Sequence, residues 1–312
     1  MRGMDIFMKI PVIFFHKGNQ EYLKIALKQC RKYNEWVVLL GDESNRELAE
    51  HSGCQWYSAD VYDLSEKWAQ FEHYYKHMST NDPLFELNCF RRFYIIYEFI
   101  LKNGIEKFVY LDSDILTYTD FSSHVAIQEN DLGMCAPKKQ DNYRWVANCG
   151  ISLWNRESLN GFLNNCIDIY KNKIEILTEK WQYHQKNHKN GGICDMTLEY
   201  LWFTNNQDLI KINFADRSNG LPGVMDFNVN SSLNYHEHEY EMMPLINIKK
   251  IKFQNELPHF QTENKEQVPV LAIHFLGAAK QYMKSFEKKN HLGFEDYVIW
   301  FMKKMKHTLW KK

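Results

Sequence analysis

The segment KFVYLDSDIL, residues 107–116, contains the most strand-like run of the chain, Lys107–Leu111, followed directly by two aspartates. Its apolar and β-branched residues predict a buried strand. A long helix is predicted just before it, over residues 84–102, because Pro83 favours a helix start and Asn103-Gly104 favours a helix end. A helix that leads into a buried strand is the repeating unit of a parallel sheet with crossover connections.

Two similar units are predicted upstream of this segment. A helix ending at Arg31 follows the first predicted strand, and helical spacing resumes at Glu43 after the second. Strands that alternate with helices predict an α/β fold in which a mostly parallel sheet forms a nucleotide-binding half, about residues 1–115. The strands predicted in this half cover residues 10–15, 36–40, 54–57 and 107–111.

The second half of the chain has a looser pattern. Residues 181–192 are rich in His, Lys and Asn and are predicted to form a loop, while residues 214–267 have many turn signals and are predicted to be irregular. Irregular segments of this length inside an α/β domain usually build or cover a site. The regular elements predicted here are strands at 132–136, 149–154 and 270–275 and helices at 155–178 and from Asp195.

The composition is that of an ordinary globular protein. Of 312 residues, 45% are hydrophobic and 25% are charged, which excludes a disordered chain, and the formal net charge of −1 argues against recruitment of nucleic acid. The seven cysteines are scattered without a CxxC spacing, so neither a zinc site nor a disulfide framework is expected. No window approaches the roughly 20 apolar residues of a membrane span, and a cytoplasmic protein is predicted.

The aspartates Asp112 and Asp114 follow the strongest predicted strand, where ligands of open α/β sheets bind. In an extended chain residues i and i+2 point to the same side, so both carboxylates are expected to face one ligand. Their mutual repulsion favours a bound cation, and Mn²⁺ or Mg²⁺ also binds the phosphate oxygens of a diphosphate leaving group. The alternative is a solvated turn in which Asp114 only caps the next segment.

The segment from Phe90 to Leu116 resembles the donor-binding region of glycosyltransferases with the GT-A fold. It is most similar to family 8, the group of glycogenin and the lipopolysaccharide galactosyltransferases. The resemblance implies that Arg92 reaches the donor, with Arg91 as the alternative, and the planar guanidinium group matches the geometry of a diphosphate. Ser113 and His16, at the ends of two predicted strands, are also expected to contact the donor.

A second motif, AIHFLGAAK at residues 272–280, is similar to the HxxGxxK motif of the same family. The resemblance implies that His274 is the third protein ligand of the metal and that Lys280 binds the diphosphate. An imidazole at a strand end can complete a site with two carboxylates, and Gly277 allows close approach of the backbone. The alternative for His274 is a core residue, and Gln281-Tyr282 replaces the usual Pro-Trp.

Two weaker similarities lie between these motifs. The segments NCGISL, residues 148–153, and GGICD, residues 191–195, resemble family segments that contact the donor sugar near the reacting carbon. They implicate Asn148 and Asp195 as candidate catalytic residues, although Met196 and Glu199 depart from the family pattern. The first strand lacks the family's Thr-Asp pair, so the nucleotide base stays open.

The resemblance implies a metal-dependent transferase that moves a hexose from a nucleotide-sugar, taken as a UDP-sugar, to a glycan or lipid-linked acceptor in bacterial surface polysaccharide synthesis. Family 8 enzymes retain anomeric configuration; in an inverting enzyme Asp195 would be the candidate base. The alternatives are a sugar nucleotidyltransferase, which generally needs a longer Gly-rich loop than residues 16–19 provide, and a non-catalytic sugar-binding protein.

The predicted domain organisation is one GT-A domain over residues 1–290, with an acceptor half at about 116–290, and a basic aromatic helix at 291–312. Val298, Phe301, Met305 and Leu309 recur there at helical spacing among several lysines. This pattern is typical of an interfacial helix, so peripheral contact of residues 294–312 with the inner face of a membrane is one expectation. The other is a terminal helix docked on the domain.

Overall fold

The structure is a computed structural model that describes residues 8–63, 65–140, 143–244 and 246–288. Its centre is a seven-stranded sheet in the order β3-β2-β1-β4-β7-β6-β8. All neighbours pair in parallel except β7, which runs antiparallel to β4 and β6. The predicted α/β fold with a mostly parallel sheet is therefore confirmed. The strands are β1 Val12–His16, β2 Val37–Gly41, β3 Gln55–Ser58, β4 Lys107–Leu111, β6 Leu132–Cys135, β7 Asn148–Asn155 and β8 Lys211–Asn213.

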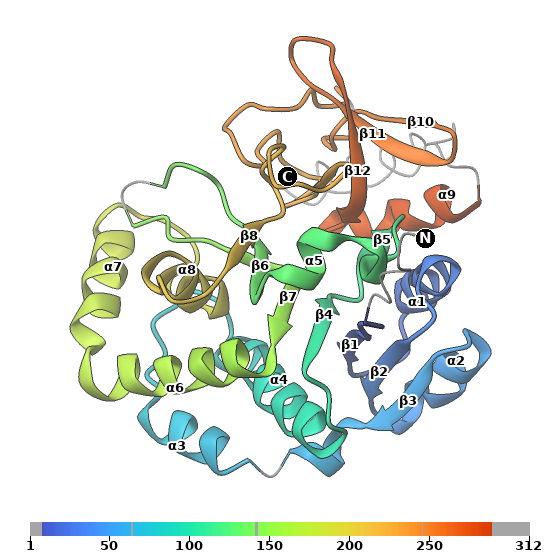
Figure 1. Cartoon of the computed structure of the whole chain (residues 1–312). Helices are drawn as coiled ribbons and strands as arrows, with labels where there is room; N and C mark the ends of the chain where they lie inside the picture. Colours follow the sequence, from blue (N-terminus) through green and yellow to red (C-terminus); the bar gives the residue numbers. More distant parts are fainter. Residues whose placement is uncertain (1–7, 64, 141–142, 245, 289–312) are drawn as a thin grey trace, which may run out of the picture.

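Both faces of the central sheet are buried. Val12 and Phe14 of β1 belong to one hydrophobic cluster and Ile13 to the other, as expected for a strand covered on both sides. Helices α3, α4 and α6 pack together against one face, while α1 packs against the opposite one (Figure 1). The helices are α1 Glu21–Tyr33, α2 Arg46–His51, α3 Glu66–Tyr74, α4 Pro83–Lys102, α5 Val125–Glu129, α6 Arg156–Asn172, α7 Ile174–Lys186, α8 Asp195–Asn205 and α9 Met283–Lys288.

Helix α4 is the longest described helix and begins where the sequence predicts. Asp82 caps it by accepting a hydrogen bond from the Phe85 amide at 3.0 Å, and Pro83 occupies its first turn. In the middle of the helix, Phe93 is fully buried, with its ring centroid 5.7 Å from that of Tyr110 on β4. This packing fixes α4 against the strand that leads into the aspartates.

A second sheet joins the two halves of the chain. β5 pairs antiparallel with β12, and the register places Ile115 opposite His274. The residue after Asp114 is thereby held against the end of the late strand. The strands of this sheet are β10 Ile251–Gln254, β11 Leu257–Gln261, β12 Gln267–His274 and β5 Ile115–Thr117, with β9 Val224–Met225 beside β12.

Three of the predicted segments in the second half are wrong in part. The predicted loop at 181–192 is helical as far as Lys186, because α7 buries Leu177 and Lys180 on one face and leaves the polar residues on the other. The segment at 214–267 is not irregular throughout, since β10 and β11 form a hairpin that pairs with β12. That pairing depends on a strand later in the chain, so local turn signals do not reveal it. The predicted helix at 155–178 is interrupted at Lys173, between α6 and α7.

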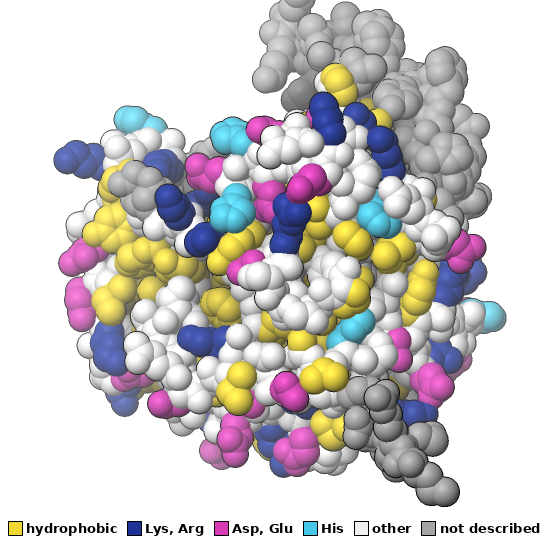
Figure 2. Space-filling view, turned by 45° about the horizontal axis from the view of Figure 1, so that its top comes forward, with side chains coloured by type: hydrophobic (Ala, Val, Ile, Leu, Met, Phe, Trp, Pro, Cys, Tyr) yellow, Lys and Arg dark blue, Asp and Glu magenta, His cyan; other side chains and the backbone are white. Residues whose placement is uncertain are grey.

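The predicted helix at 291–312, with its membrane contact, lies outside the described residues. Among the residues that are described, no helix combines the length and apolarity needed to cross a membrane. Figure 2 shows acidic and basic side chains interspersed over the face in view, in keeping with the net charge of −1.

The packing of α4 against the sheet leads to a stability prediction. Phe93→Ala should lower the free energy of unfolding by about 3–5 kcal/mol, because it leaves a cavity among large rings. Leu84→Ala, in the same helix but 69% exposed, should change it by about 0.5 kcal/mol or less. Urea unfolding followed by circular dichroism measures both, and equal effects would contradict this account of the core.

Candidate donor-binding site

A pocket of about 370 Å³ lies where several strands end at one edge of the central sheet. The carboxyl ends of β1 and β4 meet there because the two strands are parallel, and β7 contributes its beginning because it runs the other way. Every charged residue that the sequence predicts for the site lies in its lining. The predicted residues that line it are His16, Arg92, Asp112, Ser113, Asp114, Asn148, Asp195, His274 and Lys280.

The segment from Asp112 to Asp114 forms a tight turn, so the expectation of extended chain there is wrong. The Ile115 amide donates to the Asp112 carbonyl at 3.2 Å, and the Asp114 carbonyl accepts from the Phe275 amide at 2.9 Å. The turn forms because the chain leaves β4 and enters β5, which belongs to the other sheet. Both carboxylates nevertheless line the pocket.

Asp112, Asp114 and His274 can each offer one ligand atom within a mutual distance of 4.8 Å. Asp114 and His274 are buried, and His274 Nε2 lies 3.3 Å from Asp114 Oδ1. Lys280 Nζ lies 3.1 Å from Asp114 Oδ2. Burial alone would raise the pKa of Asp114, but His274 and Lys280 outweigh it and lower the pKa to about 2. Asp114 is therefore a carboxylate at neutral pH.

These three side chains fit a hard divalent cation. His274 Nε2 is buried 3.3 Å from Asp114 Oδ1 without an aligned hydrogen bond, so a cation bound between the two would take the place of a ring hydrogen. Its other nitrogen, Nδ1, lies 2.9 Å from Asn148 Nδ2. Asn148 Nδ2 also donates to the Phe227 carbonyl, and Asn148 Oδ1 accepts from the Gly150 amide at 2.8 Å, so the amide presents its nitrogen to Nδ1. Ligation of a cation through Nε2 would place the ring hydrogen on Nδ1 and would require the Asn148 amide to turn.

Arg92, and not Arg91, faces the site. Its guanidinium group donates to Asp112 Oδ1 at 3.0 Å and to Asp195 Oδ2 at 2.6 Å. Arg91 points away and pairs with Asp63 at 2.7 Å. The repulsion expected between Asp112 and Asp114 is therefore already reduced by basic partners, Arg92 for the first and Lys280 for the second.

The remaining predicted residues occupy different parts of the same region. Asp195 begins α8 and accepts a hydrogen bond from the Met196 amide at 2.8 Å, in addition to its pair with Arg92. His16 Nδ1 lies 2.9 Å from Ser113 Oγ, which joins the ends of β1 and β4. Gly277 does not line the pocket; its φ of +61° starts the 3₁₀ turn Gly277–Tyr282 that carries Lys280.

The site also depends on residues that the sequence-based prediction missed. A Cβ atom on Gly150 would lie 2.8 Å from Asp112 Oδ2 and 2.9 Å from His274 Cε1, so only glycine lets these groups converge. Glu199 is fully buried, and burial followed by repulsion from Asp195 raises its pKa well above the ordinary value. It follows Asp195 by one helical turn, and that i,i+4 spacing is the signal that could have identified it.

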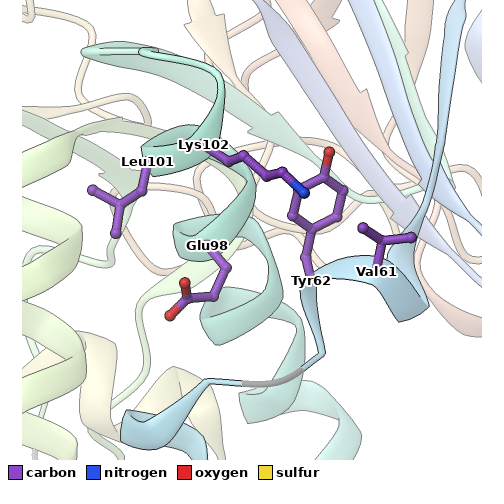
Figure 3. Close-up of a pocket in the computed structure, with 5 residues that line it drawn as sticks. All are labelled: Val61, Tyr62, Glu98, Leu101 and Lys102. Carbon is purple, nitrogen blue, oxygen red and sulfur yellow. The ribbon is translucent and has the colours of Figure 1, made fainter.

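A hollow of similar volume, about 380 Å³, lies along the last two turns of α4 (Figure 3). Its lining contains one acid, Glu98, and one base, Lys102, beside apolar side chains. No group of potential metal ligands among the described residues lies there. The two cavities therefore do not differ in volume. What singles out the pocket at the sheet edge as the candidate site is the convergence of charged side chains in it.

No protein-family model matches the sequence, and the search of curated proteins finds no match. Among solved structures, the chain is similar to apo mouse xyloside xylosyltransferase 1, with 12% identity, a TM-score of 0.42, and 66% of this chain and 85% of that one covered. The apo glycosyltransferase GlyE of Streptococcus pneumoniae TIGR4 has 12% identity and a TM-score of 0.40, with 95% of this chain and 64% of that one covered. A cytidylyltransferase from Leptospira borgpetersenii has 12% identity and a TM-score of 0.33, with 56% and 73% covered. The likeness is distant at these values, and we infer the chemistry of this chain from its own residues.

The two adjacent arginines provide a matched test of the site. Arg92→Met should lower the free energy of unfolding by about 3 kcal/mol, because Asp195 loses its charged partner in a buried position. Arg91→Met should cost about 1 kcal/mol or less, since its pair with Asp63 is partly solvated. Urea unfolding at neutral pH compares the variants, and a larger cost for Arg91→Met would contradict the assignment.

Proposed function

We propose that this protein is a glycosyltransferase of the GT-A type, similar to family 8, which transfers a hexose from a nucleotide-sugar. The observation that carries the proposal is the convergence of Asp112, Asp114 and His274 with two basic side chains, Arg92 and Lys280, in one pocket at the sheet edge. A diphosphate leaving group needs this combination, because negative charge accumulates on it as the bond to the sugar breaks.

The diphosphate would lie between the two aspartates and Lys280. Lys280 has a side chain 34% exposed, and its ammonium group is held between Asp114 and the ring of Tyr22, 4.8 Å from the ring centroid. It can therefore reach a phosphate oxygen while remaining anchored. Asp112, Asp114 and His274 would hold the divalent cation, which supplies positive charge to the departing diphosphate. The imidazole favours Mn²⁺, since Mg²⁺ prefers oxygen ligands.

The sugar would lie on the side of Arg92, Asn148 and Asp195, and the nucleoside near His16 and Ser113. Both oxygens of Asp195 are engaged, one by Arg92 and the other by the Met196 amide. This arrangement supports retention of anomeric configuration, in which stabilisation of the leaving group dominates, over an inverting reaction with Asp195 as the base.

The short connection after β1 favours a glycosyltransferase over a nucleotidyltransferase. Only residues 17–20 separate the end of β1 from the start of α1, and they contain a single glycine, Gly18. A connection this short has little backbone with which to surround a triphosphate. We further propose a UDP-sugar as the donor and a glycan or lipid-linked glycan of the bacterial surface as the acceptor, following the resemblance to lipopolysaccharide galactosyltransferases.

A screen of nucleotide-sugars for release of free nucleotide tests the proposal. The purified protein should hydrolyse at least one UDP-sugar slowly without acceptor, lose that activity in EDTA, and regain it with Mn²⁺. Asp114→Asn should abolish turnover, because the carboxylate is needed to hold the cation. It should also lower the melting temperature, because His274 and Lys280 lose their charged partner, and circular dichroism at the assay temperature checks that the variant is folded. Release of pyrophosphate from a nucleoside triphosphate and sugar phosphate would instead identify a nucleotidyltransferase.

Two lysines one turn apart give a prediction about nucleotide binding. Lys280→Ala should weaken the binding of UDP with Mn²⁺ by about ten-fold or more, because one charge-assisted contact to phosphate is lost. Lys284→Ala should leave it unchanged, since Lys284 is exposed and pairs with Glu21 at 2.8 Å. Isothermal titration calorimetry measures both affinities, and equal affinities would mean that Lys280 does not contact the diphosphate.

A further inference from the structure

Glu86 lines the same pocket but has no role in the function proposed above. It lies in the first turns of α4 and is only 1% exposed. Arg92 follows it by six residues, so the two side chains start about 9 Å apart along the helix axis. That distance is comparable with the length of a hexose joined to a phosphate, which places Glu86 near the far end of a donor sugar.

The carboxyl group of Glu86 is fixed by one oxygen and unsatisfied at the other. Oε1 accepts hydrogen bonds from Ser79 Oγ at 2.9 Å and from Asn81 Nδ2 at 2.7 Å. Oε2 is buried and has no hydrogen-bond partner among the described residues. Buried polar atoms are almost always paired in folded proteins, so an unpaired one beside a pocket is a place where water or a ligand group binds.

The chemistry of this corner favours a neutral hydroxyl group. Burial raises the pKa of Glu86, and the hydrogen bonds from Asn81 and Ser79 only partly oppose the effect. A phosphate would be repelled by the carboxylate and by nearby Asp195, whereas a sugar hydroxyl can donate a hydrogen bond to the unpaired Oε2. Phe85, also in the pocket lining and 59% exposed, adds an apolar ring surface against which the C–H face of a sugar can pack.

We propose that Glu86, oriented by Ser79 and Asn81, is a specificity-determining residue that binds a hydroxyl group of the transferred hexose. The proposal rests on the proposed function and extends it from the diphosphate to the sugar. Glu86 lies outside all the segments that resemble the family. It would contact the sugar, at the opposite end of the donor from the diphosphate that Lys280 would bind.

Glu86 also has a structural role that the test must separate from recognition. Ser79 pairs with Gly192, and the Ile193 amide donates to the Met78 carbonyl at 2.8 Å, just before α8 and Asp195 begin. Deleting the side chain would therefore disturb Asp195 through this loop. Glu86→Gln keeps an oxygen for Ser79 and Asn81 and changes only the second position from an acid to an amide.

The experiment compares Glu86→Gln with Glu98→Gln, a matched control on the same helix in the other hollow (Figure 3). Isothermal titration calorimetry with Mn²⁺ uses UDP, UDP-glucose, UDP-galactose, UDP-N-acetylglucosamine and UDP-xylose as probes. Glu86→Gln should bind UDP within two-fold of the wild type but bind the preferred UDP-sugar about ten-fold more weakly, because only the sugar contact is lost. Glu98→Gln should match the wild type for every probe.

Deoxy analogues of the preferred sugar then identify the hydroxyl. One analogue should bind the wild type about ten-fold more weakly than the parent sugar, and Glu86→Gln should show no such difference between the two. A structural role alone would not remove the penalty for a single hydroxyl.

Three results overturn the proposal in distinguishable ways. If the wild type does not bind UDP with Mn²⁺, the proposed function fails as well. If the wild type binds UDP but gains no affinity from any of the sugars, or if Glu86→Gln binds them all normally, only the role of Glu86 fails. If Glu86→Gln loses UDP affinity and melting temperature together, its role is structural.

Discussion

The antiparallel pairing of β5 with β12 is the constraint on which the site depends. It sets Ile115 opposite His274, and the Phe275 amide donates to the Asp114 carbonyl at 2.9 Å. Backbone hydrogen bonds therefore hold an aspartate from the first half of the chain against a histidine from its end. A slip of one residue in this register would turn His274 to the other face of the sheet and separate the candidate metal ligands.

Around that junction the protein has to keep several largely buried acids close together in one pocket. It does so by giving them different partners. Asp114 is balanced by Lys280 and His274, and Asp112 shares Arg92 with Asp195. Glu199, whose carboxyl oxygens have no hydrogen-bond partner among the described residues, has a pKa raised well above its ordinary value by burial and by repulsion from Asp195. Pairing three acids with bases, and disfavouring the charged form of the fourth, limits the electrostatic cost of a site that must still attract a cation.

Segments of the second half that lie outside the central sheet support this arrangement. The buried pair of Lys249 and Asp226 lies behind β12, and Asp226 Oδ2 accepts a hydrogen bond from the His274 amide at 3.2 Å. The segment before α4 pairs with the segment before α8, which couples the start of the Arg92 helix to the position of Asp195. Long loops here are therefore part of the framework of the pocket as well as its walls.

The sequence by itself determined the elements whose signals are local. β4 and α4 have their predicted bounds to within a residue, because a strong apolar run, Pro83 and Asn103-Gly104 mark them without reference to the rest of the chain. The motif residues could also be chosen in advance, since their types and order were sufficient for a resemblance.

The tertiary structure alone decided which of two adjacent arginines enters the site, that Gly150 is needed there, and that Glu86 and Glu199 lie beside it. The helical residues 181–186, predicted as part of a loop at 181–192, and the unpredicted hairpin of β10 and β11 have the same origin. Each depends on burial or pairing against residues distant in sequence, and no local pattern records those contacts.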